Sequence, residues 1–115
     1  MRDRFVSPGD VFICDFGKQT GSLQGGKRPV IFCGNSKEGA FSSIAHVVPL
    51  TKVDKPFPLH FVLTKTVYPN LDYDSEALCE QYQLVDKQKL GQLLFKLNID
   101  DLCNIVKLCH KNLPF

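Results

Sequence analysis

Short apolar runs alternate with polar stretches rich in glycine, proline and asparagine through most of this chain. Runs of this length, enriched in β-branched and aromatic residues and bounded by turn residues, predict β-strands rather than helices. The intervening segments 17–27 and 34–42 are predicted to be loops. Pro49 lies inside one run, and because proline cannot donate to a ladder it predicts an edge strand or a bulge. The predicted strands are 11–16, 29–33, 43–51, 60–63, 76–84 and 90–96.

A helical period occurs only near the C-terminus. Asn98 can cap a helix there, with Asp101 three residues later as a weak capping box. The apolar residues that follow recur at three- and four-residue intervals and form one stripe, which predicts a helix packed on the sheet. The fold class is therefore mainly β, a small, strongly bent antiparallel β-barrel with a C-terminal α-helix. The stripe consists of Ile99, Leu102, Cys103, Val106, Cys109 and Leu113, and Pro114 ends it.

The chain length and composition are those of one globular domain over residues 1–115, with 43% hydrophobic and 23% charged residues. No apolar run approaches the ~20 residues that a bilayer span requires. The N-terminal residues are not followed by the apolar core and cleavage site of a secretory signal. We therefore expect a cytoplasmic protein that has no membrane partner.

A formal net charge of only +2 is too weak to indicate a nucleic-acid-binding domain by itself. Contact with nucleic acid would require a local patch, for which Lys27, Arg28 and Lys52 are candidates. The five cysteines show neither a C-x-x-C pair nor metal-ligand spacing, which favours reduced structural thiols over disulfides or a zinc site. We expect no metal site and no cofactor.

Three polar residues at or inside predicted strands suggest chemistry. Cleaving RNA without a metal needs a base for the 2′-hydroxyl, an acid for the leaving 5′-oxygen, and positive charge for the phosphorane. Arg28 can stabilise that charge, Thr51 can donate a hydrogen bond to a phosphate oxygen, and Glu80 can be the base if burial raises its pKa. Nucleotide-binding and nucleophile-elbow motifs are absent from the sequence.

Each of these residues also has a structural interpretation. Thr51 can simply terminate its strand through a side-chain turn. Glu80 can be a buried carboxylate paired with a lysine or arginine. His46 and His60 lie in predicted strands as satisfied sheet residues, and His110 in the last helical turn favours the negative helix end. No histidine is predicted to be catalytic.

The polar elements, taken in order, resemble the MazF/PemK (Kid) family of toxin endoribonucleases. The resemblance extends from about residue 9 to the C-terminal helix, and its most specific element is Q-G-G-x-R-P at 24–29. The segments that carry it are Gly9-Asp10-Val11, Gly21 to Val30, Val48-Pro49-Leu50-Thr51, Cys79-Glu80-Gln81 and Val85 to Gly91.

The resemblance implies an SH3-like barrel that forms a homodimer and binds single-stranded RNA in a groove. It further implies metal-independent, sequence-selective cleavage of mRNA to 2′,3′-cyclic phosphate and 5′-hydroxyl ends, neutralised by a cognate antitoxin with which the toxin binds DNA. It assigns catalysis to Arg28, Thr51 and Glu80. The RNA-binding residues it implies are Ser22, Gln24, Gly25, Lys27, Lys52, Gln81 and Gln83.

Three positions depart from the family pattern. Leu23 stands where many members have an acidic residue, Gln83 where many have an arginine, and Lys52 where a serine often follows the threonine. Two alternatives therefore stay open. One is a non-enzymatic toxin that binds a protein target, as gyrase poisons of this barrel type do, and the other is a degenerate member that binds RNA without cleaving it.

Overall fold

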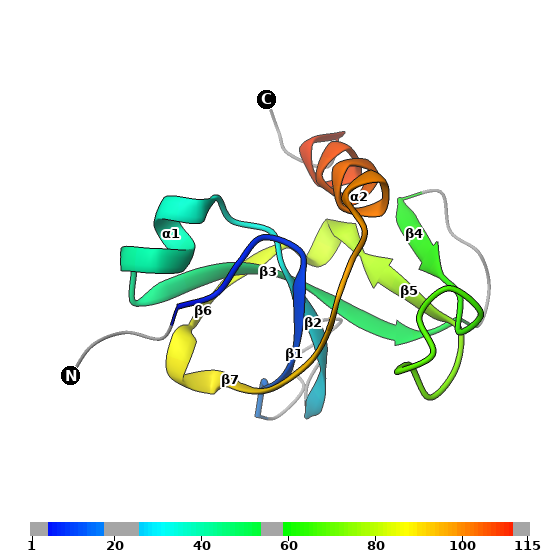
Figure 1. Ribbon diagram of the computed structural model, residues 1–115, viewed down its shortest axis with the longest axis horizontal. Helices are drawn as coiled ribbons and strands as arrows, with labels where there is room; N and C mark the ends of the chain where they lie inside the picture. The colour runs from blue at the N-terminus through cyan, green and yellow to red at the C-terminus, as the bar shows by residue number, and fades with distance from the viewer. Residues whose placement is uncertain (1–4, 18–25, 54–58, 112–115) are drawn as a thin grey trace.

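The computed structural model of the protein describes residues 5–17, 26–53 and 59–111, in which strands dominate and one long helix closes the chain (Figure 1). The predicted strands and helix are found with ends shifted by a few residues, apart from the corrections given below. The elements in chain order are β1 (Asp10–Asp15), β2 (Lys27–Phe32), α1 (Ser36–Phe41), β3 (Ile44–Lys52), β4 (His60–Leu63), β5 (Ser75–Leu78), η1 (Cys79–Gln81, a 3-10 turn), β6 (Gln83–Asp86), η2 (Lys87–Lys89, a 3-10 turn), β7 (Leu90–Lys96) and α2 (Ile99–Lys111).

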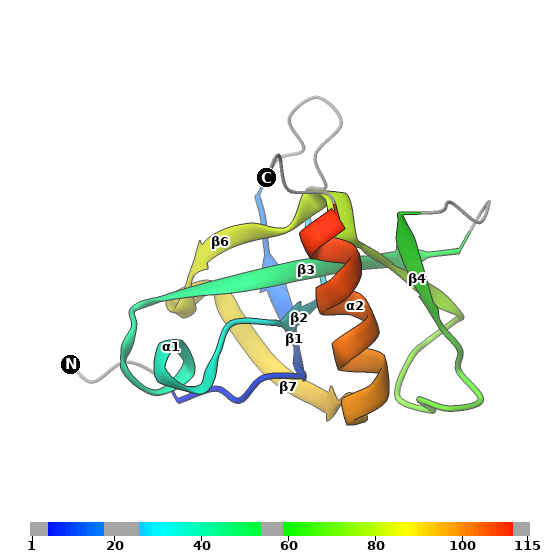
Figure 2. The same cartoon turned by 90° about the horizontal axis from the view of Figure 1, so that it is seen from above.

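The strands form one strongly bent antiparallel sheet in the order β4-β5-β3-β2-β1-β7, with β6 also paired to β3. Figure 2 shows β3 crossing the molecule from the α1 end to the β4 end. The mainly β class with a C-terminal helix is thus confirmed. No ladder between described residues joins β4 to β7, so the bent sheet is not closed.

The predicted strand at 76–84 is in fact two strands separated by η1. β5 and β6 lie on the same side of β3 and run in the same direction, with Ala77 opposite Leu50 and Gln83 opposite Val47. The two residues between Val47 and Leu50 therefore face five residues, 78–82. Pro49 is one of these two, and it has no N–H to give to a ladder. The expectation of an edge strand at Pro49 is wrong, because β3 is central and its partner is interrupted instead.

The segment 34–42, predicted to be a loop, contains the short helix α1. Asn35 caps it, since its Oδ1 accepts from the backbone N of Glu38 at 2.9 Å. At the other end the buried Lys87 Nζ donates to the carbonyl oxygens of Glu38 and Gly39 at 2.8 and 2.9 Å. A methyl group at Gly39 would lie 2.0 Å from the carbonyl oxygen of Val6, so the helix packs backbone against backbone. This helix is held by caps rather than by an apolar stripe.

Two apolar clusters lie on opposite faces of the sheet. On β2, Ile31 belongs to one cluster, whereas its neighbours Val30 and Phe32 belong to the other. The first cluster receives α2 through Leu102, Ile105 and Cys109. Leu102 and Cys109 belong to the predicted stripe, but Ile105 does not, and the predicted stripe residues Ile99 and Cys103 are exposed. All five cysteines are free thiols. None of the described helices is long and apolar enough to cross a membrane.

Candidate functional site

Arg28 and Thr51 come together at the same end of the neighbouring strands β2 and β3. The register pairs Val30 with Pro49. Arg28 lies two residues before Val30 and Thr51 two residues after Pro49, so in this antiparallel pair both lie toward the same end. Since side chains on alternate residues share a face, Arg28 and Thr51 belong to one face of the sheet. Both also line one pocket of about 270 Å³. The structure therefore brings together two of the three residues predicted to be catalytic.

The wall of this pocket combines charge, polar groups and apolar surface, as expected of a site that binds an organic ligand. The segment before β5 supplies the polar residues Asn70, Asp72 and Tyr73. Lys52 lies just outside, with its Nζ 5.6 Å from the centre of the Tyr73 ring. The lining residues are Ile13, Lys27, Arg28, Pro29, Leu50, Thr51, Asn70, Leu71, Asp72, Tyr73, Ser75 and Leu94.

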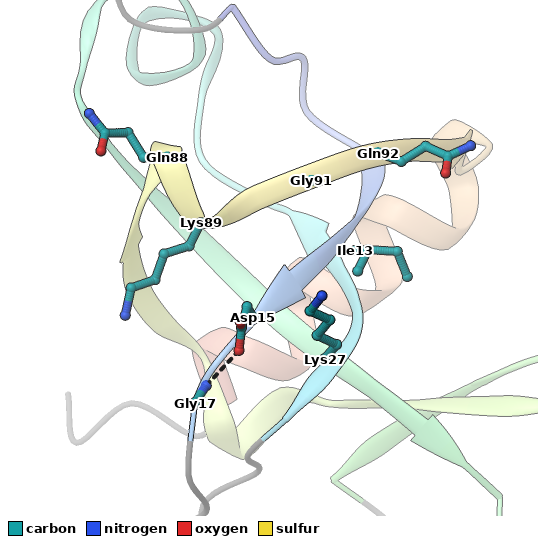
Figure 3. A pocket seen from close by; sticks show the side chains of 8 residues that line it. All are labelled: Ile13, Asp15, Gly17, Lys27, Gln88, Lys89, Gly91 and Gln92. Atoms are coloured by element: carbon teal, nitrogen blue, oxygen red, sulfur yellow. Dashed lines mark hydrogen bonds between the residues drawn. The ribbon is translucent and has the colours of Figure 1, made fainter.

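A larger and more open pocket of about 650 Å³ lies on the other side of Lys27 (Figure 3). Ile13 and Lys27 line both pockets, so the two hollows adjoin. Its wall carries a second amine, Lys89, and one carboxylate, Asp15, whose Oδ1 accepts from the backbone N of Gly17 at 2.9 Å. The two adjoining pockets carry amines at intervals along their walls, a pattern that suits an extended anionic chain.

Glu80, the third residue predicted to be catalytic, does not line the Arg28–Thr51 pocket. It belongs to η1, and its two carboxylate oxygens lie 2.7 and 2.9 Å from Nε2 of His60. Its side chain is 35% exposed. The interpretation of Glu80 as a buried carboxylate paired with lysine or arginine is therefore wrong, and the burial that its role as base called for is not found.

His60 lies between two carboxylates, because its Nδ1 also contacts Oε1 of Glu76. Burial of the ring works to lower the pKa of His60, but hydrogen bonds and charge from Glu80 and Glu76 outweigh it and raise that pKa above its usual value. Glu76 is buried and stands directly opposite Thr51 in the β3–β5 register. The sequence did not identify His60 or Glu76 as site residues; the signal was a charged or polar residue inside each of two short apolar strands.

The residues predicted to bind RNA are spread over several elements. Ser22, Gln24 and Gly25 lie outside the described residues. Lys27 lines both pockets, and Lys52 is exposed at the end of β3.

The remaining two, Gln81 of η1 and Gln83 of β6, are joined by a hydrogen bond from Gln83 Nε2 to the carbonyl oxygen of Gln81 at 3.2 Å. Neither residue lines the two pockets. Within the described ranges, no group of three or more His, Cys, Asp or Glu side chains is arranged to hold a metal ion.

Comparison with known proteins gives a consistent result. Residues 7–111 match the family described as PemK-like, MazF-like toxin of type II toxin–antitoxin system. The endoribonuclease MazF of Staphylococcus saprophyticus is 36% identical over 92 residues, which cover 78% of this chain and 76% of that protein. The crystal structure of MazF from Deinococcus radiodurans has a TM-score of 0.80 at 19% identity and covers 95% of this chain and 96% of its own. A mycobacterial endoribonuclease in complex with its cognate antitoxin has a TM-score of 0.71 at 18% identity, with 96% of each chain covered.

Proposed function

This chain belongs to the PemK-like, MazF-like toxins of type II toxin–antitoxin systems, and from that premise we propose how it acts. It is an endoribonuclease that cuts single-stranded mRNA at short sequences without a metal ion. The products are a 2′,3′-cyclic phosphate and a 5′-hydroxyl end. The observation that carries the proposal is the meeting of Arg28 and Thr51 at one pocket in a chain of this family.

The reaction is an internal transfer at phosphorus. The 2′-oxygen of one nucleotide attacks the adjacent phosphorus while the bond from phosphorus to the 5′-oxygen breaks. A base takes the 2′-hydroxyl proton, and an acid gives a proton to the departing 5′-oxygen. The guanidinium of Arg28 stabilises the added negative charge on the phosphorane through paired N–H donors, and the hydroxyl of Thr51 donates to a non-bridging oxygen. Glu80 remains the proposed base.

We propose that the RNA lies along the two adjoining pockets, on both sides of the scissile phosphate. Lys27 lies where the pockets meet, so its amine can contact a phosphate next to the one that reacts. Lys89 lies farther along the larger pocket and Lys52 beside the smaller one. These amines bind the backbone without taking part in bond breaking, so they contribute to affinity and to salt dependence.

Two protein partners follow from the family proposal. The mycobacterial neighbour is an endoribonuclease in complex with its cognate antitoxin, and we propose that this chain is likewise neutralised by an antitoxin with which it binds DNA. An antitoxin segment with acidic and aromatic residues suits a hollow lined by amines and apolar side chains. We also propose a homodimer, acting in the cytoplasm, where its mRNA substrate is found.

The proposal is tested by incubating the purified protein with a long RNA in excess EDTA and mapping both ends of each product. We expect cuts at a short recurrent sequence, with cyclic phosphate and 5′-hydroxyl ends. The Arg28→Ala variant is expected to lose cleavage and growth arrest while it stays folded and still binds the antitoxin. Lys37→Ala, an exposed cation on α1, is the matched control and is expected to cleave like the wild-type protein.

Three results would contradict the proposal. Wild-type cleavage by Arg28→Ala would remove the role of Arg28. RNA that is bound but never cut by the wild-type protein would indicate a degenerate, binding-only member. Growth arrest that persists in the Arg28→Ala/Thr51→Ala variant without any RNA cleavage would indicate a protein target instead.

A further inference from the structure

His60 is the one histidine of the described residues whose two ring nitrogens both face carboxylate oxygens. Nδ1 faces Glu76 of β5, and Nε2 lies 2.7 and 2.9 Å from the oxygens of Glu80 in η1. A carboxylate only accepts hydrogen bonds, and a neutral imidazole has only one N–H to donate. The geometry is therefore satisfied with both carboxylates ionised only if His60 carries both protons as an imidazolium.

The burial of Glu76 supports this assignment. The His60 side chain is 12% exposed and that of Glu76 is 5% exposed, whereas that of Glu80 is 35% exposed. An ionised carboxylate as deeply buried as Glu76 requires a positive partner. Glu76 and Glu80 both act on the ring through hydrogen bonds and charge, while α2, which also packs on β4 and η1, places the Cys109 thiol beside Cys79.

The cluster reaches the candidate site through the sheet. Glu76 and Thr51 are direct cross-strand partners, so their Cβ atoms are about 5 Å apart on the same face. His60 contacts Glu76 along the same strand pair, and Glu80 is bound on the far side of the ring. Thr51, Glu76, His60 and Glu80 thus form a connected row from the pocket end of β3 to η1.

We propose that His60, held as an imidazolium between Glu76 and Glu80, is a positioning residue for RNA cleavage. This inference rests on the function proposed above. On one side His60 fixes the Glu76 carboxylate that faces Thr51. On the other side its Nε2 holds the carboxylate of Glu80, the group proposed to accept the 2′-hydroxyl proton. His60 itself does not touch the reacting atoms; it acts through its two partners.

The obvious variant, His60→Gln, leaves Glu76 buried without a positive partner and so can fail to fold. The double variant His60→Gln/Glu76→Gln removes both charges of the buried pair with little change in shape, and such replacements usually keep a protein folded. The matched control is His46→Gln, which changes the other histidine that contacts a carboxylate but lies away from the pocket residues.

Steady-state cleavage of an RNA containing the mapped site gives the decisive measurement. We expect kcat to fall about 100-fold in the double variant with KM nearly unchanged, because the reacting groups are displaced while the RNA still binds. We also expect the pH–rate profile to change shape, since a merely structural residue would not move it. The control is expected to retain the wild-type kcat and pH profile.

A readout that needs no catalysis tests the charge state. Nitrogen-15 spectra of the histidine rings are expected to show both nitrogens of His60 protonated at neutral pH. A neutral ring, or a folded double variant with wild-type kcat, would overturn the positioning role and leave the endoribonuclease proposal intact. Absence of any RNA cleavage by the wild-type protein would overturn the endoribonuclease proposal, and the positioning role would fall with it.

Discussion

Two histidines of this sheet bind glutamates, yet they lie in different settings. His46 of β3 donates from Nδ1 to Oε1 of Glu38 at 2.6 Å, and the other oxygen of Glu38 accepts from the backbone N of His46 at 2.7 Å. The Tyr82 ring stacks on His46 with ring centroids 5.1 Å apart. His60 instead joins two glutamates that come from separate elements, β5 and η1.

The difference shows which end of the sheet is scaffold and which is site. Glu38 uses its carboxylate to tie the end of α1 to the backbone of β3, so it replaces hydrogen bonds that secondary structure would otherwise supply. The carboxylates of Glu76 and Glu80 instead bind the two ring nitrogens of His60, which can donate to both carboxylates only when the ring is protonated. We infer that the α1 end keeps the fold, and that the β4–η1 end holds charge for chemistry.

The largest expected difference is in stability. His60→Gln should lower the free energy of unfolding by about 4 kcal/mol, because it leaves the Glu76 carboxylate buried without a positive partner. His46→Gln should cost about 1 kcal/mol, since His46 is 32% exposed and loses one hydrogen bond. Urea unfolding of the two variants checks this. Equal losses would break the contrast between the two ends.

Gly39→Ala tests the α1 end without touching a charge. The added methyl would meet the Val6 carbonyl oxygen, so we expect a loss of about 3 kcal/mol in unfolding free energy, with kcat per folded molecule unchanged. Lys37→Ala on the same helix is the control and should change stability by less than about 0.5 kcal/mol. A fall in kcat at full folding would show that α1 also belongs to the site.

Removal of one glutamate from each end should give opposite results. Glu38→Ala leaves the backbone N–H of His46 without its acceptor and should cost about 2 kcal/mol of stability while cleavage persists. Glu80→Ala removes an exposed carboxylate and should lower kcat more than it lowers stability. Thermal unfolding and single-turnover cleavage of both variants measure the two effects. Loss of cleavage in Glu38→Ala, or its retention in Glu80→Ala, would contradict the assignment.

The smallest expected effect is a pH dependence of stability from His60. Its pKa is raised in the folded state, so the folded protein binds this proton more tightly than the unfolded chain does. The stabilisation is complete below the unfolded pKa of about 6.5 and is lost as pH rises through the folded pKa. The stability difference between wild type and His60→Gln/Glu76→Gln should therefore shrink with rising pH. A difference that stays constant from acid to alkaline pH would contradict it.

The sequence predicted those elements whose pattern is local and apolar. The runs that became β1, β3 and β4 were identified, and so was the helix α2. The buried face of α2 includes Ile105, which the predicted stripe omitted, whereas Ile99 and Cys103 of that stripe are exposed. It did not predict α1, because that helix has six residues, one of them glycine, and no apolar stripe. The local signal for this helix is the capping pair Asn35 and Glu38.

The candidate site divides in the same way. Arg28 and Thr51 were identified from a motif, and the β2–β3 register brings them to one pocket. The position of Glu80 depends on a break in its predicted strand opposite Pro49. The apolar pattern of residues 76–84 does not indicate this break. The relation between His60 and Glu76 arises from the register of the consecutive strands β4 and β5, which the sequence pattern alone does not set.

The break at η1 has a consequence for how this protein can vary. β5 and β6 take their registers from β3 separately, on either side of Pro49. A residue added or removed within the connecting segment 79–82 therefore shifts neither ladder. Length changes there would move the carboxylate of Glu80 relative to Thr51 while the sheet stayed as it is. The η1 turn is thus the place where relatives or engineered variants can adjust the chemistry of the site independently of the sheet that carries it.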